Sequence, residues 1–94
     1  MVIFTLKHDK GSSKEKKFLN EGKDILSSIP VVKNFKVSKQ TSKKNDFDFG
    51  FSMEFADQNE YDTYNNHPDH LSFVKNRWEK EVAEFLEIDF ETME

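Results

Sequence analysis

The sequence predicts an α+β fold in which helices cover one face of an antiparallel sheet. Three observations predict it. Apolar residues occupy every second position of a central stretch, which is the period of a strand. They recur at three- and four-residue spacing in two other stretches, which is the period of a helix. The stretches follow one another in the order strand, helix, strand, strand, helix, strand.

The clearest strand covers residues 46–55. Successive side chains of a strand point to opposite faces, so its apolar residues all lie on one face. The polar or small residues between them lie on the other. The apolar row consists of Phe47, Phe49, Phe51, Met53 and Phe55. We expect the helices of the same chain to cover this row.

A strand over residues 1–7 and a helix precede the central strand. Ser12 followed by Glu15 is a capping box, which opens a helix that Pro30 ends. Gly22 interrupts the apolar stripe of this helix at a cost of roughly 1 kcal/mol relative to alanine. It therefore predicts close packing on the sheet in preference to room for a bound molecule.

A second strand over residues 31–41 and a turn lead into the central strand. After it, Asp57 and Glu60 form another capping pattern and open a short helix. His67 is predicted to cap the next helix, which starts with Pro68. The apolar face of that helix includes one histidine and one arginine: His70, Phe73, Val74, Arg77 and Trp78. A last strand is predicted over residues 86–91.

These elements predict a ferredoxin-like arrangement with both helices on one face of the sheet. The opposite face is then open, and Ile3, Val32 and part of the last strand are predicted to point from it. An uncovered sheet face favours packing against a second copy. We therefore expect a homodimer.

Length and composition exclude several classes of protein. Ninety-four residues form a single domain, residues 1–94, with 14 cations against 18 anions and a net charge of −4. This balance disfavours binding to nucleic acid or membrane. The chain has no cysteine and no apolar run of the ~20 residues that span a bilayer. We expect a cytoplasmic protein without a cofactor.

Three segments carry a resemblance to a known family. Residues 64–74 (YNNHPDHLSFV) resemble the Y-x-x-H-P-x-H-x-x-F-V segment of the stress-responsive α/β-barrel (Dabb) domain proteins. Residues 47–55 resemble that family's central strand, and residues 88–90 its closing strand. The resemblance implies a ferredoxin-like subunit whose sheet packs on its twin's to form an α+β barrel.

The resemblance also implies candidate catalytic residues. In plant polyketide cyclases of this family, a tyrosine and a histidine act as acid and base, and an aspartate orients the histidine. These roles fall on Tyr64, His70 and Asp89. Phe49 stands where those cyclases carry a histidine, which removes a hydrogen-bonding group. The H-P-x-H segment is shared with monooxygenase relatives, so enzymatic activity of either kind is an alternative.

The expected function is the binding of a small apolar or aromatic molecule between sheet and helices, or a structural role in stress. A mostly apolar cavity with a few polar groups is typical of such sites. The predicted ligand-binding residues are Phe4, Phe49, Phe51 and Phe73. The alternative to a ligand-binding or catalytic role is that His70 is a buried structural histidine. The spacing of His67 and His70 predicts no metal, because capping already explains His67.

An RNA-binding module is the remaining alternative. Such modules share this order of elements and stack bases on aromatic residues of the third strand. Phe49-Gly50-Phe51 is similar to that aromatic run. The acidic net charge and the expected burial of these rings disfavour it.

Overall fold

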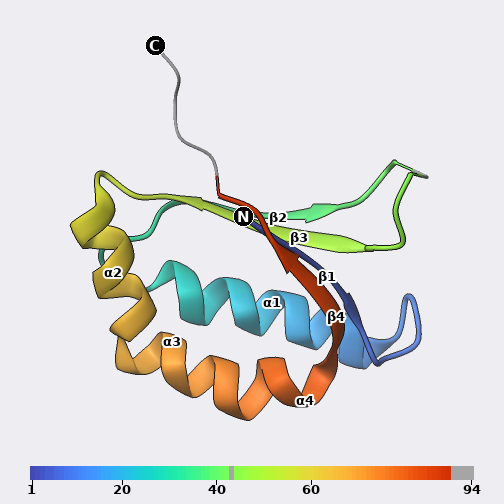
Figure 1. Ribbon diagram of the computed structural model, residues 1–94. Coiled ribbons are helices and arrows are strands. Elements are labelled where there is room, and N and C mark those ends of the chain that lie inside the picture. Colours follow the sequence, from blue (N-terminus) through green and yellow to red (C-terminus); the bar gives the residue numbers. More distant parts are fainter. Residues whose placement is uncertain (43, 90–94) are drawn as a thin grey trace.

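The computed structural model describes residues 1–42 and 44–89 and shows one sheet with helices on one face (Figure 1). The strands are β1 (Val2–Leu6), β2 (Lys33–Lys39), β3 (Phe49–Glu54) and β4 (Val82–Glu87). Their spatial order is β2-β3-β1-β4, and each adjacent pair is antiparallel. The described residues therefore have the predicted ferredoxin-like arrangement.

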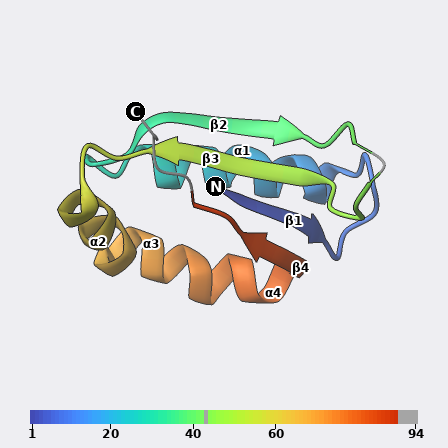
Figure 2. The ribbon, with the colours of Figure 1, turned by 45° about the horizontal axis from the view of Figure 1, so that its top comes forward.

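The helices all pack on the same side of this sheet (Figure 2). Helix α1 (Ser13–Ser27) connects β1 to β2, and helix α2 (Gln58–Asn66) follows β3. After α2, a second helical run leads directly into β4. It consists of α3 (Pro68–Phe73), a π-helical turn η1 (Val74–Trp78) and a last turn α4 (Glu79–Glu81).

Phe49 and Phe51 of the predicted apolar row lie beneath the helices, as predicted, whereas Phe47 precedes β3 and is not among the residues that pack on the core. Phe49 is opposite Phe4 and Phe51 is opposite Val2, so these residues share one face of the sheet. Phe4 and Phe51 are fully buried, and Phe49 is 9% exposed. Because the rings of Phe49 and Phe51 are covered by the chain's own helices, neither is available for base stacking.

The predicted helix starts are confirmed. The Ser12 hydroxyl accepts a hydrogen bond from the Glu15 amide (3.2 Å), and the Glu15 carboxylate accepts one from the Gly11 amide (3.1 Å). Asp57 accepts one from the Glu60 amide (2.9 Å). His67 Nδ1 caps α3 by accepting a bond from the Asp69 amide (3.1 Å). Local side chains therefore satisfy amides that a helix start leaves free.

Gly22 marks close packing, as predicted. A Cβ atom at this position would lie 3.0 Å from Cζ of Phe51 and 3.2 Å from Cζ of Phe73. These distances are shorter than normal van der Waals contacts. Glycine therefore lets α1 approach the aromatic rings from β3 and α3.

Several elements differ from the sequence prediction. The central strand, predicted over residues 46–55, covers Phe49–Glu54 as β3. The helix after Pro68 is not regular throughout, since η1 interrupts it. The last strand starts at Val82, because Val82 lies opposite Leu6 and is buried there, and it ends at Glu87. The predicted strand residue Phe90 lies outside the described residues. β2 is also shorter than predicted and covers Lys33–Lys39.

The open face of the sheet was predicted correctly for β1 and β4 but not for Val32. Ile3 and Leu86 are opposite one another on the side away from the helices. Val32 was predicted to join them. It precedes β2 and packs against the hydrophobic core instead.

Candidate functional site

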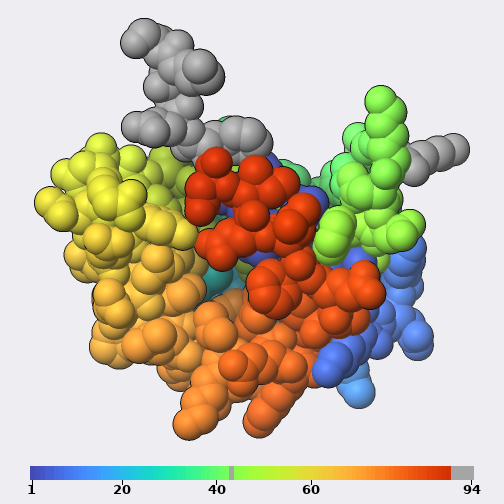
Figure 3. All heavy atoms as spheres, in the orientation of Figure 1, coloured from blue at the N-terminus to red at the C-terminus, as the bar shows by residue number. Residues whose placement is uncertain are grey.

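The surface is hollowed between β4 and the helices α2 and α3 (Figure 3). Part of α1 is visible at the floor of this hollow. We call this the β4–α3 hollow. Tyr64 near the end of α2 and His70 in α3 lie beside one another, with ring centroids 4.3 Å apart. The break at His67-Pro68 brings them together, because it ends α2 and starts α3 within two residues.

His70 is held as a neutral hydrogen-bond acceptor. Its Nδ1 lies 3.2 Å from the carbonyl oxygen of Asn65. A carbonyl only accepts, so Nδ1 carries the proton and donates, and Nε2 of the neutral ring has a free lone pair. Burial lowers the pKa of His70, and this effect exceeds the opposing effects of the Asn65 hydrogen bond and the Glu87 charge. The ring is therefore neutral at pH 7.

Tyr64 is held as a hydrogen-bond donor. Its side chain is buried, with 7% exposure. Burial raises the pKa of its hydroxyl above the ordinary value, and the nearby negative charge of Glu87 raises it further. A phenol with a raised pKa keeps its proton at neutral pH. Tyr64 and His70 therefore offer a donor and an acceptor next to each other.

The carboxylates of Glu87 and Asp89, at and just after the end of β4, lie close to the hydroxyl of Tyr61. The Tyr61 hydroxyl donates a hydrogen bond to Glu87 Oε1 (3.0 Å) and lies 3.4 Å from Asp89 Oδ2. The charge of Glu87 affects the pKa of both Tyr64 and His70. Glu87 is therefore the carboxylate whose negative charge acts on both Tyr64 and His70.

Asp89 does not have the position that was expected of it. Its side chain is 60% exposed and lies 3.7 Å from the Met1 amino group. Within the described part of the chain, the Asn65 carbonyl and not Asp89 bonds to His70 Nδ1. The structure therefore brings Tyr64 and His70 together but leaves Asp89 apart from the histidine.

The four predicted ligand-binding phenylalanines form part of the aromatic core. The rings of Phe4 and Phe51 are 4.8 Å apart, and those of Phe4 and Phe49 are 6.0 Å apart. Phe73 packs on Phe18 at 5.6 Å. Their rings fill the space between sheet and helices. They therefore support the candidate site from behind.

Phe73 also lines a separate groove between α1 and the α3–η1 run. This groove has a volume of about 440 Å³ and includes Ile25, Ser72 and Arg77. Arg77 is already paired with two carboxylates, Glu81 at 2.5 Å and Glu21 at 3.0 Å. Its charge is therefore neutralised within the fold.

Sequence reasoning missed Tyr61, Asn65 and Glu87. Two signals were present. Tyr61 is three residues before Tyr64, which places both on one side of a helix. Glu87 is two residues before Asp89, so both lie on one face of a strand. The Asn65 contact comes from a backbone carbonyl, which no side-chain motif reveals.

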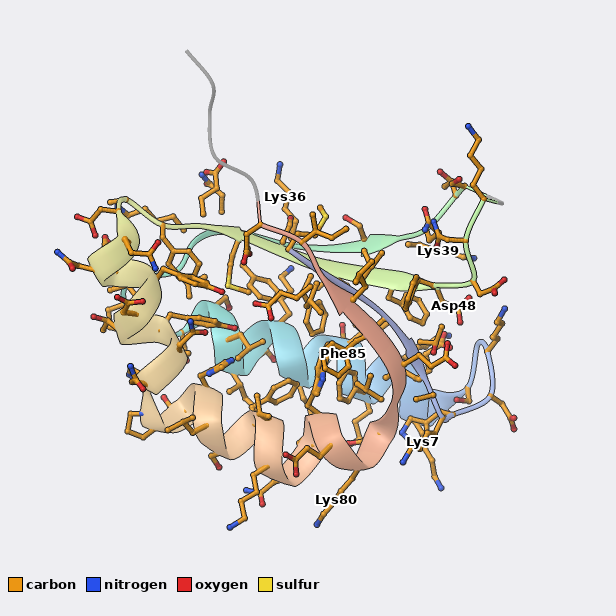
Figure 4. The ribbon with its side chains drawn as sticks, in the orientation of Figure 1. Lys7, Lys36, Lys39, Asp48, Lys80 and Phe85 are labelled. Atoms are coloured by element: carbon orange, nitrogen blue, oxygen red, sulfur yellow. The ribbon has the colours of Figure 1, made fainter. Side chains whose placement is uncertain are left out.

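An exposed aromatic ring lies on β4 near the hollow. Phe85 is 57% exposed although it faces the helices, and its ring is 5.7 Å from that of Trp78 (Figure 4).

No cluster of three potential metal ligands occurs among residues 1–42 and 44–89. In the same ranges, no helix has the length and apolarity needed to cross a bilayer.

The chain matches the family model described as Stress responsive A/B Barrel Domain (Dabb) over residues 1–92. The chain belongs to the Dabb family. A Dabb family protein of Mesorhizobium loti with a ferredoxin-like fold is 54% identical, with a TM-score of 0.97. That match covers 99% of this Dabb chain and 93% of the other. A comparison with proteins of curated function gave no match.

More distant structures share the fold of this Dabb protein. An Arabidopsis thaliana protein has 19% identity and a TM-score of 0.84, and the match covers 99% of this chain and 92% of that one. A dimeric ferredoxin-like protein of unknown function from Bacteroides fragilis has 19% identity and a TM-score of 0.73, with coverage of 97% and 91%.

Proposed function

We propose that this Dabb protein is a homodimer that binds a small aromatic molecule with a hydroxyl or carbonyl group in the β4–α3 hollow. The observation that carries the proposal is the pair formed by Tyr64 and His70. A protonated phenol and a neutral imidazole supply one donor and one acceptor beside an aromatic core. Convergent polar groups on an apolar wall are typical of small-molecule sites.

The exposed ring of Phe85 supports an aromatic ligand. It stands beside Trp78 at the edge of the hollow without being covered by the chain itself. A flat apolar molecule can pack on such a ring in an offset or edge-to-face arrangement. The closed packing of Phe4 and Phe51 limits the ligand to the outer part of the site.

Homodimerisation is supported by the open face of the sheet. Leu86 is 49% exposed there and lies opposite Ile3. The structurally similar protein of Bacteroides fragilis is described as dimeric. Sedimentation equilibrium tests this part, and a mass of two chains is the expected result. A mass of one chain at micromolar concentration contradicts it.

Binding is tested with two molecules that differ by one hydroxyl, 4-propylphenol and propylbenzene. In NMR titrations of the ¹⁵N-labelled protein, we expect the phenol to shift the amides of Tyr64 and His70 and to bind about tenfold more tightly, roughly one hydrogen bond's worth. His70→Ala should abolish this difference. Lys75→Ala, an exposed change in the same helical run, should leave it intact.

Equal affinity for both molecules contradicts the role of the polar pair. Absence of binding by either contradicts the site as a whole.

Proton-transfer catalysis is the second candidate function. It is favoured by the free lone pair on His70 Nε2 next to the Tyr64 hydroxyl, since a base and a donor together can enolise a ketone. Acetophenone in D₂O tests it: the protein should speed deuterium exchange of the methyl group, and His70→Ala should abolish the acceleration. Deuterium exchange at the uncatalysed rate contradicts proton-transfer catalysis and leaves ligand binding as the proposed function.

A further inference from the structure

We propose that the ligand of the β4–α3 hollow is an aromatic amine, whose ammonium group binds to Glu87 while the Tyr64–His70 pair binds its other polar end. This inference rests on the proposed ligand site and names the class of molecule that the site takes. Three observations support it: the charge of the elements around the hollow, the position of Glu87, and the unpaired hydroxyl of Tyr64.

The elements that border the hollow carry acidic residues and no cationic ones. The segments α2, α3 and β4 contain no lysine and no arginine, although the chain has 14 such residues. Their carboxylates are those of Glu60, Asp62, Asp69, Glu84 and Glu87. A recess whose walls share one sign of charge concentrates ions of the opposite sign. The hollow therefore favours a cationic ligand over an anionic one.

Glu87 is the carboxylate on the helix side of β4. It lies opposite Val2, which in turn lies opposite Phe51, so all three are on the face that the helices cover. Its Oε1 accepts the hydrogen bond from Tyr61, which holds the side chain towards α2. Among the ion pairs of the described residues, none includes Glu87. Because a carboxylate has about four lone-pair sites, Glu87 can accept further bonds from an ammonium group.

The two other carboxylates of residues 82–89 are placed differently. Asp89 lies 3.7 Å from the Met1 amino group, which supplies it with a positive charge. Glu84 lies opposite Thr5, on the face away from the helices. Glu87 is therefore the acidic group of this strand that a cation in the hollow would meet.

Tyr64 independently indicates a ligand in the same place. Its side chain is only 7% exposed, and its hydroxyl makes no hydrogen bond to residues 1–42 or 44–89. Buried polar side chains normally have a hydrogen-bond partner. The hydroxyl also senses the negative charge of Glu87, which raises its pKa together with burial. A molecule that bonds to Tyr64 is therefore close enough to interact with Glu87.

One small molecule can reach both groups. Tyr61 and Tyr64 are three residues apart in α2, which places their Cβ atoms about 5–6 Å from each other. Tyr61 bonds to Glu87, so the carboxylate lies about one side chain away from the pair. Phe85 is two residues before Glu87 on the same face, about 6–7 Å along the strand, and Figure 4 shows it on the helix side of β4. The aromatic ring of the amine can pack on it.

Tyramine and 4-propylphenol test the inference in the full chain. They have the same phenol and the same length, but tyramine ends in an ammonium group where 4-propylphenol ends in a methyl group. Like the lysine side chain, this amine is protonated at pH 7. NMR titrations at low salt measure both affinities. Added salt should lower the ratio of tyramine affinity to 4-propylphenol affinity, because it screens the charge of Glu87.

Glu87→Gln removes the charge and keeps an oxygen that can accept the Tyr61 hydrogen bond. The same ratio should fall about fourfold in this variant, within the range of an exposed ion pair. Glu84→Gln is the matched control, since it makes the same change on the other face of β4, and should leave the ratio unchanged.

The failure of this inference differs from the failure of the ligand site. A ratio that is equal in the parent and in Glu87→Gln, or that falls as far in Glu84→Gln, overturns the ammonium site and leaves the phenol site standing. Absence of binding by both compounds removes the ligand site and the inference together.

Discussion

The hydroxyl of Tyr61 donates a hydrogen bond to Glu87 across 3.0 Å and so joins α2 to the edge strand β4. The two residues are 26 positions apart in the chain. The bond places a carboxylate at the end of the strand that borders the hollow. It also makes Glu87 the acidic group that faces Tyr64 and His70, in place of Asp89.

The field of Glu87 should be visible in the titration of His70. The negative charge of Glu87 raises the pKa of His70 against the larger lowering effect of burial. Glu87→Gln removes that charge, so we expect the pKa of His70 to fall further below its ordinary value. Histidine ring resonances followed by NMR against pH measure the change. Asp89→Asn is the matched control and should leave the His70 pKa unchanged; a larger effect of Asp89→Asn would restore the role expected from the sequence.

Gly22→Ala should destabilise the protein although alanine favours helices. The added methyl group meets rings of Phe51 and Phe73 at 3.0 and 3.2 Å, and both rings are buried. Overpacking of this kind costs about 1–3 kcal/mol, which exceeds the gain of roughly 1 kcal/mol in helix propensity. Urea unfolding measures the net loss. Asn20→Ala, exposed on the same helix, should be neutral or stabilising, and an equal gain at position 22 would contradict the packing.

The fold was predictable because its signals are local and repeated. The alternating row of β3 and the side-chain caps at Ser12 and Asp57 depend only on nearby residues. The π-helical turn η1 was not predictable in this way. Its Trp78 ring packs on Phe4 at 4.9 Å, a contact with a strand more than seventy positions earlier in the chain. Tertiary contacts of this kind leave no periodic mark in the sequence.

The candidate site was predictable in part for the same reason. Tyr64 and His70 lie on either side of a helix break that the sequence marks with Asn66, His67 and Pro68. Their proximity is therefore a local consequence. The partner of His70 depends instead on which acceptor its ring meets, and that acceptor is the carbonyl of Asn65 in α2. Side-chain orientation decides that choice, and the motif does not encode it.

Phe85 should matter for binding more than for stability. Its ring is 57% exposed, so Phe85→Ala removes little buried area and should cost less than about 1 kcal/mol in the free energy of unfolding. Truncating the fully buried Phe4 to alanine should cost about 3–5 kcal/mol. The affinity for 4-propylphenol should nevertheless fall several-fold in Phe85→Ala. Leu71→Ala, which changes another exposed apolar residue, should not alter it, and unchanged binding in Phe85→Ala would move the site away from β4.

Glu81 should make the stability of the protein depend on pH in the acid range. Burial acts to raise the pKa of Glu81, but hydrogen bonds from Arg77 and His8 outweigh burial and hold the pKa below its ordinary value of 4.5. The bonds are 2.5 Å from Arg77 Nε and 2.6 Å from His8 Nε2. The folded state therefore binds fewer protons than the unfolded state in this range, and acid favours unfolding.

The stabilisation by Glu81 should be complete above about pH 4.5 and should be lost as the pH falls through the lower pKa of the folded state. Glu81→Gln should thus cost about 2 kcal/mol at pH 7, the typical worth of hydrogen bonds to a charged group, and progressively less towards pH 3. Urea unfolding of parent and variant at several pH values measures the difference. The neighbouring exposed change Glu79→Gln should show no such convergence. A difference between parent and Glu81→Gln that stays constant from pH 7 to pH 3 contradicts the depressed pKa, because only a group that titrates in the folded state can lose its contribution with acid.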